Sequence, residues 1–338
     1  MEKKLLGDSD LSVTPICVGC WQFNDGEMSG DRTWNGQPYA MSKSIVDTAL
    51  ELGINFFDTA EAYLNSEGVV GRLFEGRRQG VVLASKFGYG ANKKTGYTAL
   101  DIEQALTASL ERLRTDYLDL YQVHWPTVID ENLEEVVKEL ERQKSLGRIR
   151  YYGVSNFGKT DLEKFIAAGG KPITNQVLYN LLARGCEYEM LPYSVEKGIS
   201  ILAYSPLQQG LLSGKYLKSE DVPEGRRRNR LFSSSSTSLS RHGEEGCETE
   251  LFTAIGELKT ICDERNISMP SVSLSWLLKQ KGLSSVIVGA ASPEQITANT
   301  KFTDISAEMD STLKDITEPI KVALGTNCDL WAEKSRHG

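Results

Sequence analysis

Residues 118–155 decide the fold, and they read LDLYQVHWPTVIDENLEEVVKELERQKSLGRIRYYGVS. Apolar and β-branched residues fill residues 118–124 and 149–155, which predicts two strands. Between them, four apolar residues recur at helical spacing: Leu133, Val136, Val137 and Leu140. A strand, a helix and a strand in this order predict parallel strands joined by a right-handed crossover.

The same alternation extends along most of the chain. Eight short strands are expected, at residues 17–21, 56–58, 81–86, 118–124, 149–155, 175–177, 199–204 and 285–288. Helical patterns lie between or after them, at residues 45–50, 101–113, 133–140, 162–168, 189–196, 250–265, 271–280, 293–299 and 307–324. Asp101 is expected to be the N-cap of the second helix in this series.

Eight parallel strands with intervening helices favour an α/β fold of the closed (β/α)8 TIM-barrel type. An open doubly wound sheet is the alternative. Its dinucleotide fingerprint G-x-G-x-x-G should follow the first strand, and no such motif occurs there. Gly88-Tyr89-Gly90 follows the third strand and lacks the last glycine, so the barrel is the prediction.

The 338 residues are expected to form one domain, 1–338, because α/β barrels of this size are single units. Gly7-Asp8 between apolar pairs predicts an N-terminal hairpin that could cap the barrel floor. Residues 207–248 form a long polar loop after the seventh strand, and loops of this length are usually functional lids or disordered. A helical segment extends the C-terminus.

Composition argues against several classes of protein. Lys and Arg total 38 against 46 Asp and Glu, a formal net charge of -8, which argues against a nucleic-acid binder. No apolar run is long enough for a transmembrane helix, and MEKKLLGDSD lacks the apolar core of a secretory signal. We therefore expect a cytoplasmic protein with no membrane association and no metal site. Its six cysteines are expected to be reduced, and Cys17 and Cys20 to be structural.

Four polar residues stand at or just after the carboxyl ends of successive predicted strands: Asp58, Tyr63, Lys86 and His124. In a barrel these ends converge on one pit, where active sites lie. A Lys ammonium lowers the pKa of a nearby Tyr, an Asp holds the ammonium in place, and a His can orient a substrate oxygen. Each residue alone has a structural interpretation, as a helix N-cap, a solvated lysine or a packed aromatic ring. Together they indicate proton transfer coupled to another step.

Seven motifs follow one another in a specific order. They are GINFFDTAEAY at residues 53–63, ASKFG at 84–88, DLYQVHWP at 119–126, GVSNF at 153–157, NQVLYN at 175–180, YSPLQQGLLSGKY at 204–216 and VIVGAASPEQITAN at 286–299. With these motifs the sequence resembles the aldo-keto reductase superfamily, in particular the branch of aryl-alcohol dehydrogenase-like reductases and potassium-channel β subunits. The resemblance covers about residues 5–299.

The resemblance implies an NADP(H)-dependent reductase that converts an aldehyde or ketone, a small-molecule carbonyl substrate, to an alcohol. In the family pattern Tyr63 is the general acid, and Lys86 lowers its pKa. Asp58 pairs with Lys86, and His124 positions the carbonyl. Hydride passes from the nicotinamide C4 to the substrate carbon while Tyr63 protonates the developing alkoxide.

The resemblance also implies a set of cofactor-binding residues. They are Ser155, Asn156 and Gln176 at the carboxamide, Tyr204 stacked on the nicotinamide, Ser205, Leu207, Gly210 and Lys215 at the pyrophosphate, and Gly289, Gln295 and Asn299 at the adenosine end. Ala291 departs from the usual Ser near the 2′-phosphate, and Ala298 from the usual Glu at the adenine. The three arginines at residues 226–228 either compensate as phosphate ligands or form a solvated basic turn. NADP is the expected cofactor.

Trp21 and Trp125 are expected to line the substrate pocket, which favours an apolar or aromatic carbonyl compound, although Trp21 could equally pack on the barrel top. The loop at residues 24–37, which contains Trp34, is a further candidate. Two other functions remain open. One is a cofactor-binding regulatory subunit of a membrane channel with little turnover. The other is a barrel aldolase with Lys86 as Schiff-base nucleophile, which Asp58 disfavours by keeping the lysine charged.

Overall fold

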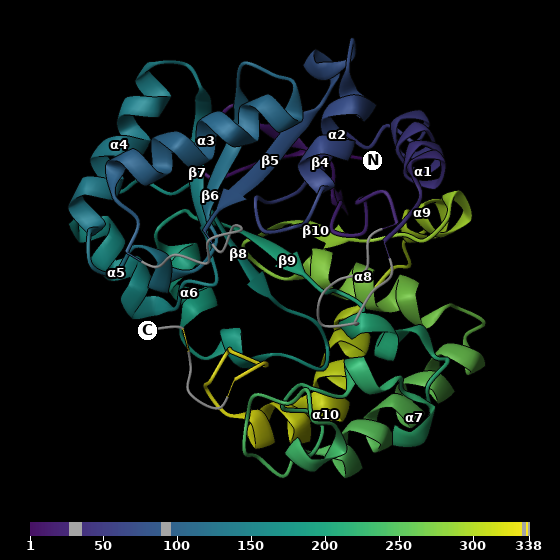
Figure 1. Cartoon of the computed structure of the whole chain (residues 1–338). Coiled ribbons are helices and arrows are strands. Elements are labelled where there is room, and N and C mark those ends of the chain that lie inside the picture. The colour runs from purple at the N-terminus through teal and green to yellow at the C-terminus, as the bar shows by residue number, and fades with distance from the viewer. Residues whose placement is uncertain (27–35, 89–95, 333–335, 337–338) are drawn as a thin grey trace.

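The computed structural model describes residues 1–26, 36–88, 96–332 and 336. At its centre, parallel strands close into a barrel in the order β10-β3-β4-β5-β6-β7-β8-β9 (Figure 1). The strands are β3 Ile16–Gly19, β4 Phe56–Asp58, β5 Val82–Phe87, β6 Leu118–Val123, β7 Ile149–Ser155, β8 Thr174–Leu178, β9 Ser200–Tyr204 and β10 Leu283–Val288. All eight expected strands are present, so the (β/α)8 TIM barrel is confirmed. Trp34, Tyr89 and Gly90 lie outside the described residues.

Helices surround the barrel and extend beyond it. They are α1 Tyr39–Glu51, α2 Ser66–Phe74, α3 Ala99–Leu113, α4 Leu133–Ser145, α5 Lys159–Ala167, α6 Met190–Glu196, α7 Glu248–Glu264, α8 Met269–Lys279, α9 Pro293–Asn299 and α10 Ala307–Leu324. Sequence periodicity missed α2, because Gly68 and Gly71 weaken its helical pattern. A Cβ at Gly71 would lie 2.3 Å from the carbonyl oxygen of Arg112, so the glycine permits close packing of α2 on α3.

The start of α3 differs from the prediction. Thr98, not Asp101, is the N-cap, and its side chain accepts a hydrogen bond from the Asp101 backbone N–H. The Asp101 carboxylate in turn accepts from the Thr98 backbone N–H at 2.9 Å. The two residues therefore form a capping box, in which a residue three positions into the helix resembles a cap in sequence.

The N-terminal hairpin closes the amino-terminal end of the barrel, as expected. Its strands, β1 Lys4–Leu5 and β2 Ser12–Val13, pair antiparallel. Buried apolar side chains of the hairpin join a cluster inside the barrel: Leu6, Leu11 and Val13 from the hairpin, with Cys17, Phe56, Val82, Leu120 and Leu202 among its partners. Gly7 has a φ of +50°, and a Cβ there would lie 2.5 Å from the carbonyl oxygen of Ile173. Only glycine fits this close approach without strain.

The long segment at residues 207–248 follows β9 and consists of short 3-10 turns joined by irregular chain. Leu231 and Phe232 anchor it, because both are fully buried. The Arg230 guanidinium donates hydrogen bonds to the carbonyl oxygens of Leu324 at 2.9 Å and Asn327 at 3.0 Å. The segment is thereby tied to the chain that follows α10, and α10 packs beside α7 (Figure 1).

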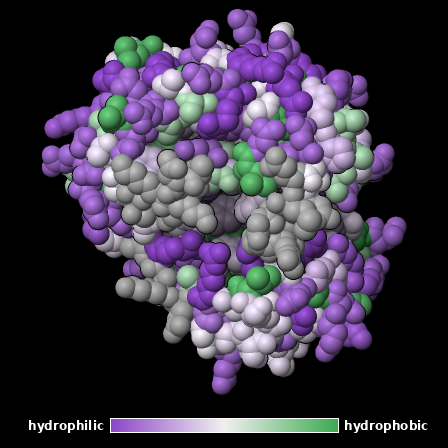
Figure 2. Space-filling model, in the orientation of Figure 1, coloured by the Kyte–Doolittle hydropathy of each residue, from purple (hydrophilic) through white to green (hydrophobic). Residues whose placement is uncertain are grey.

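Among the described residues, no helix has both the length and the apolar character needed to cross a bilayer. Hydrophilic residues cover most of the face shown in Figure 2, which has a hollow near its centre. Apolar residues on that face are scattered among the polar ones. Cys17 and Cys20 are fully buried free thiols, in agreement with a structural role.

Candidate active site

Lys86 is the centre of the polar cluster at the carboxyl ends of the strands. It lies near the end of β5, and its ammonium is fully buried. Its Nζ donates hydrogen bonds to Asp58 Oδ2 at 2.6 Å, to the Thr59 carbonyl oxygen at 2.9 Å and to the Tyr63 hydroxyl at 3.4 Å. These contacts use all three N–H donors of the ammonium. The interpretation of Lys86 as a solvated lysine is therefore excluded, as is that of Asp58 as a helix cap, because Asn65 caps the next helix.

Aromatic rings hold Tyr63 beside the other predicted residues. Its ring stacks on Trp21 with 5.0 Å between centroids and an angle of 21°. His124, which follows β6 directly, meets the same ring edge-on at 5.7 Å and 77°. Trp21 is 41% exposed, so it forms an outer wall rather than a piece of the core. The structure thus brings Asp58, Tyr63, Lys86 and His124 into one cluster.

Lys86 lowers the pKa of Tyr63, as expected, but the net pKa of the phenol is raised. Burial raises the pKa of the phenol, and this effect together with the Asp58 charge outweighs the lowering by the Lys86 ammonium. Burial alone would lower the pKa of Lys86, but Asp58 and Tyr63 raise it above its usual value. At neutral pH the pair is therefore a neutral phenol beside a charged ammonium.

The His124 imidazole is also uncharged at neutral pH. Burial and the Lys86 charge lower the pKa of its imidazole to about 3. A neutral imidazole can donate a hydrogen bond from one ring nitrogen without giving up a full proton.

The predicted carboxamide residues lie together beside this cluster. Ser155 ends β7, and its hydroxyl donates to the Gln176 carbonyl oxygen at 2.9 Å. Asn156 has a φ of +61°, and its Nδ2 donates to the His124 carbonyl oxygen at 3.0 Å. Its Oδ1 accepts from the Tyr204 hydroxyl at 2.8 Å. Strain of this kind in a non-glycine residue is common at functional sites.

Gln122 is a buried site residue that the sequence analysis missed. It lies in β6, two positions before His124, and is fully buried. Its Nε2 lies 3.4 Å from Asp58 Oδ1, which also accepts from Gln176 Nε2 at 2.9 Å. The alternation of side chains along a strand, counted back from His124, was the signal that could have identified it.

The predicted pyrophosphate segment has an unusual backbone. Positive φ angles occur at Ser205, Gln208, Gln209 and Gly210, with values of +51°, +43°, +53° and +95°. A Cβ at Gly210 would lie 3.4 Å from Lys215 Cε and 3.5 Å from Arg226 Nη1, so both cations are adjacent to this turn. Arg226 Nη1 also donates to the Gln209 carbonyl oxygen at 3.1 Å. The Gln208 and Gly210 backbone N–H groups donate to the Ser205 and Leu207 carbonyl oxygens, so the two cations are the groups at this turn that suit an anion.

The three arginines have different surroundings. Arg226 contacts the turn at Gly210, whereas Arg228 lies over the Trp331 ring at 5.6 Å. Burial raises the pKa of Glu248, but hydrogen bonds led by the Ser233 backbone N–H, with a smaller contribution from the Arg227 charge, lower it below its usual value. Of the two interpretations for these residues, the geometry therefore favours a phosphate ligand at Arg226.

The predicted adenosine end lies after β10. Gly289 follows that strand, and Gln295 and Asn299 lie on α9. Gln295 Oε1 accepts from the Ala291 backbone N–H at 2.8 Å, so the side chain closes the turn that contains Ala291. Ser292 is the N-cap of α9 and supplies a hydroxyl next to that position.

Residues near the C-terminus also border the site, which no motif indicated. The Arg336 guanidinium lies 3.8 Å from the centroid of the Trp125 ring. Asp329, 1% exposed, accepts from Arg336 Nε at 2.5 Å and Nη2 at 2.9 Å. Burial raises the pKa of the Tyr204 phenol, and an interaction with Trp331 partly offsets this rise. The chain after α10 thus returns to the barrel mouth next to Trp125 and Tyr204.

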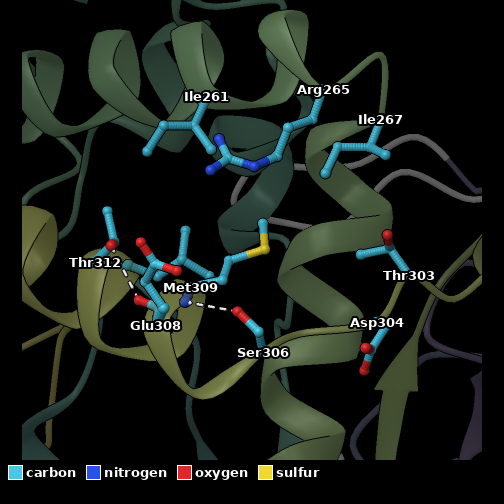
Figure 3. Close-up of a pocket in the computed structure, with 10 residues that line it drawn as sticks. Ile261, Arg265, Ile267, Thr303, Asp304, Ser306, Glu308, Met309 and Thr312 are labelled. Atoms are coloured by element: carbon cyan, nitrogen blue, oxygen red, sulfur yellow. Dashed lines mark hydrogen bonds between the residues drawn. The ribbon is translucent and has the colours of Figure 1, made fainter.

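Two cavities lie elsewhere on the described surface. One of 260 Å³ is lined by Ile261 and Arg265 from the α7 side and by Glu308 and Met309 from the α10 side (Figure 3). The other, of 520 Å³, adjoins α6 and contains Arg184. Neither lining includes a residue of the polar cluster or of the predicted cofactor set. The described residues also contain no group of three or more His, Cys, Asp or Glu that could hold a metal.

Comparison with known proteins identifies the family. Residues 15–318 match the model of the aldo/keto reductase family. The chain belongs to the aldo-keto reductase family. The holo form of aldo-keto reductase AKR11C1 from Bacillus halodurans superposes with a TM-score of 0.73 at 28% identity, over 94% of this chain and 96% of that one.

Curated relatives of this aldo-keto reductase include two types of protein. An NADH-specific methylglyoxal reductase of Escherichia coli is 31% identical, over 93% of this chain and 97% of its own length. A putative voltage-gated potassium channel subunit beta of Schizosaccharomyces pombe is 32% identical, over 88% and 87%. The relatives named as reductases support carbonyl reduction as the general activity of an oxidoreductase.

Proposed function

We propose that this protein reduces an aldehyde or ketone to the alcohol with NADPH, in a reversible reaction in which Tyr63 is the general acid. One observation carries the proposal: the buried Lys86 ammonium, held by Asp58 at 2.6 Å, lies 3.4 Å from the Tyr63 hydroxyl. A fixed positive charge beside a phenol stabilises the phenolate that forms when the proton leaves.

The proton is available because the phenol is neutral. The raised pKa of Tyr63 keeps its hydroxyl protonated at neutral pH, so it can protonate a developing alkoxide. Lys86 then lies next to the phenolate, and Asp58 keeps the ammonium in place. His124, neutral because its pKa is lowered to about 3, is the group that would orient the carbonyl oxygen by a hydrogen bond.

The residues around this cluster fit a nicotinamide dinucleotide. Ser155, Asn156 and Gln176 would hold a carboxamide, which needs both donors and acceptors. Tyr204, oriented by Asn156, would pack against the nicotinamide ring. When bound, the reduced nicotinamide supplies the hydride that goes to the carbonyl carbon.

The phosphate end is where cofactor choice is decided. Ser205, Leu207, Gly210 and Lys215 would follow the pyrophosphate, with Arg226 adjacent, and Gly289, Gln295 and Asn299 would contact the adenosine. We propose NADP(H) as the cofactor because of the cations near this turn, although Ala291 and Ala298 remove contacts usual in the family. The methylglyoxal reductase of Escherichia coli is named NADH-specific, so both cofactors belong in the test.

We also propose that residues 1–338 act as one domain in the cytoplasm, with the segment at residues 207–248 closing over the cofactor phosphates. The substrate would lie between Trp21, which stacks on Tyr63, and Trp125, which follows His124 in the chain. Aromatic walls favour an apolar or aromatic carbonyl compound.

The test is turnover of the full chain with a panel of aldehydes, ketones and quinones, followed by the loss of reduced-nicotinamide absorbance with NADPH and with NADH. We expect turnover, with tighter binding of NADPH than of NADH. Binding of either cofactor without turnover of any carbonyl would favour the second candidate, a regulatory subunit. The similarity to a channel subunit beta supports that candidate, which predicts tight co-purification with a membrane partner.

A further inference from the structure

Gln122 links the proton-donating cluster to the predicted carboxamide pocket. It is paired with Lys86 in the register of β5 and β6, and its side chain is fully buried within the barrel. Its amide lies 3.4 Å from Asp58 Oδ1 and 3.5 Å from Gln176 Nε2. One side chain therefore contacts both the carboxylate that holds Lys86 and a residue of the cofactor pocket.

The Asp58 carboxylate, which is ion-paired with Lys86, determines how both amides are oriented. Such a carboxylate accepts hydrogen bonds and cannot donate them. Its Oδ2 is bound by Lys86, so the nitrogens of Gln122 and Gln176 must face Oδ1. The Gln122 oxygen then faces the Gln176 nitrogen at 3.5 Å.

In this arrangement the side-chain nitrogen of Gln176 donates its hydrogen bonds to other residues of the protein. Its N–H groups face Asp58 Oδ1 and Gln122 Oε1, so its carbonyl oxygen is the part of the amide left to meet a ligand. A carboxamide NH2 is a donor and needs such an acceptor. Without Gln122, the Gln176 amide would lose one of the two partners that fix its orientation.

We propose that Gln122 is a positioning residue, which holds Gln176 as an acceptor for the cofactor carboxamide and Asp58 as the partner of Lys86. This inference rests on the proposed function for its catalytic part only. Its cofactor-binding part rests only on the proposed binding of a nicotinamide dinucleotide, so it is tested by affinity whether or not the chain turns over a carbonyl compound. If Gln122 only filled space, its substitution would change neither the affinity for the dinucleotide nor turnover.

The test compares Gln122→Leu and Gln122→Glu with the wild-type chain. Gln122→Leu removes the donor and the acceptor at similar volume, and we expect NADPH affinity and kcat each to fall about tenfold. Gln143→Leu is the matched control, because Gln143 is equally buried but lies on α4, bonded to Glu139 and Arg148. Both leucine variants should lose thermal stability, whereas only Gln122→Leu should lose NADPH affinity.

Gln122→Glu gives a signature that depends on pH. The introduced carboxyl group has an O–H donor when protonated, and when ionised it has none and repels Asp58. Its activity relative to wild type should therefore approach one at low pH and fall as pH rises. If Gln122→Leu folds and binds NADPH as the wild type does, the inference is wrong.

A ratio of Gln122→Glu to wild-type activity that stays constant across pH would also overturn the inference, because a structural defect alone has no such titration. If the wild-type chain turns over no carbonyl compound, the proposed function fails instead. The NADPH titrations of Gln122→Leu and Gln143→Leu then still decide the role of Gln122.

Discussion

The Lys86 ammonium lies 3.4 Å from the Tyr63 hydroxyl at the mouth of the barrel. This contact joins a buried cation to a neutral phenol, and it is the geometry that a proton donor to a developing alkoxide requires. Asp58 holds the Lys86 ammonium in place by a hydrogen bond. Trp21 stacks on the face of the Tyr63 ring, and His124 meets the same ring edge-on.

The pH dependence of carbonyl reduction should follow Tyr63 rather than His124. The pKa of Tyr63 is raised by burial, so the active, protonated form persists through neutral pH and is lost only above the usual value of about 10. The pKa of His124 is about 3, so no loss should occur as pH falls from 8 toward that value. A profile of kcat/KM for reduction against pH measures both the loss at high pH and the absence of a loss at low pH. An acid limb with a midpoint near the usual His value of about 6.5 would contradict the neutral role of His124.

Arg226→Gln should weaken NADPH binding about tenfold, because it removes a cation beside the turn at Gly210. Arg265→Gln, in the cavity between α7 and α10, is the control and should leave the affinity unchanged (Figure 3). Cofactor titration of the two variants makes the comparison. Equal NADPH affinities of the two variants would instead support the interpretation of residues 226–228 as a solvated basic turn.

Arg336→Ala should raise KM for the carbonyl substrate about tenfold, since Arg336 covers the ring of Trp125. Its NADPH affinity should stay at the wild-type value, because the predicted cofactor contacts do not include this residue. Arg77→Ala removes a similar arginine-aromatic contact, with Phe74, and serves as the control. Steady-state kinetics that show no change in KM would place the substrate away from Trp125.

Two glycines in helices should respond to alanine in opposite directions. Gly71→Ala should destabilise the fold by about 2 kcal/mol, because the new Cβ would meet the Arg112 carbonyl oxygen at 2.3 Å. Gly256→Ala, in α7, places its Cβ in open space and should stabilise the helix by about 1 kcal/mol. Thermal unfolding of both variants measures these changes. A stabilised Gly71→Ala would show that α2 and α3 do not pack as closely as described.

The sequence predicted the barrel and its polar cluster because strand ends are visible in local patterns. Asp58, Lys86 and His124 each follow a run of apolar residues, and parallel strands bring such ends together. Gln122 was missed because a single glutamine inside a strand carries no signal until its neighbour, His124, is assigned to the same face. Thr98 was missed as the N-cap because Asp101, three residues later, has the same preference for helix starts.

Other features depend on packing that no local pattern records. The direction of the Tyr63 pKa depends on burial, which competes with the Lys86 charge only in the folded chain. Helix α2 contains Gly71 because α3 lies against it, and its weak periodicity follows from that contact. The return of Trp331 and Arg336 to Tyr204 and Trp125 joins segments more than a hundred residues apart.

The most direct measurement is the rate of NADPH-dependent carbonyl reduction by Tyr63→Phe beside the wild-type chain, with NADPH affinity measured for both. The substitution keeps the ring that stacks on Trp21 and removes only the hydroxyl at Lys86. We predict a loss of kcat of about 10²- to 10⁴-fold with cofactor affinity unchanged. Equal rates in the two proteins would contradict the assignment of Tyr63 as the general acid.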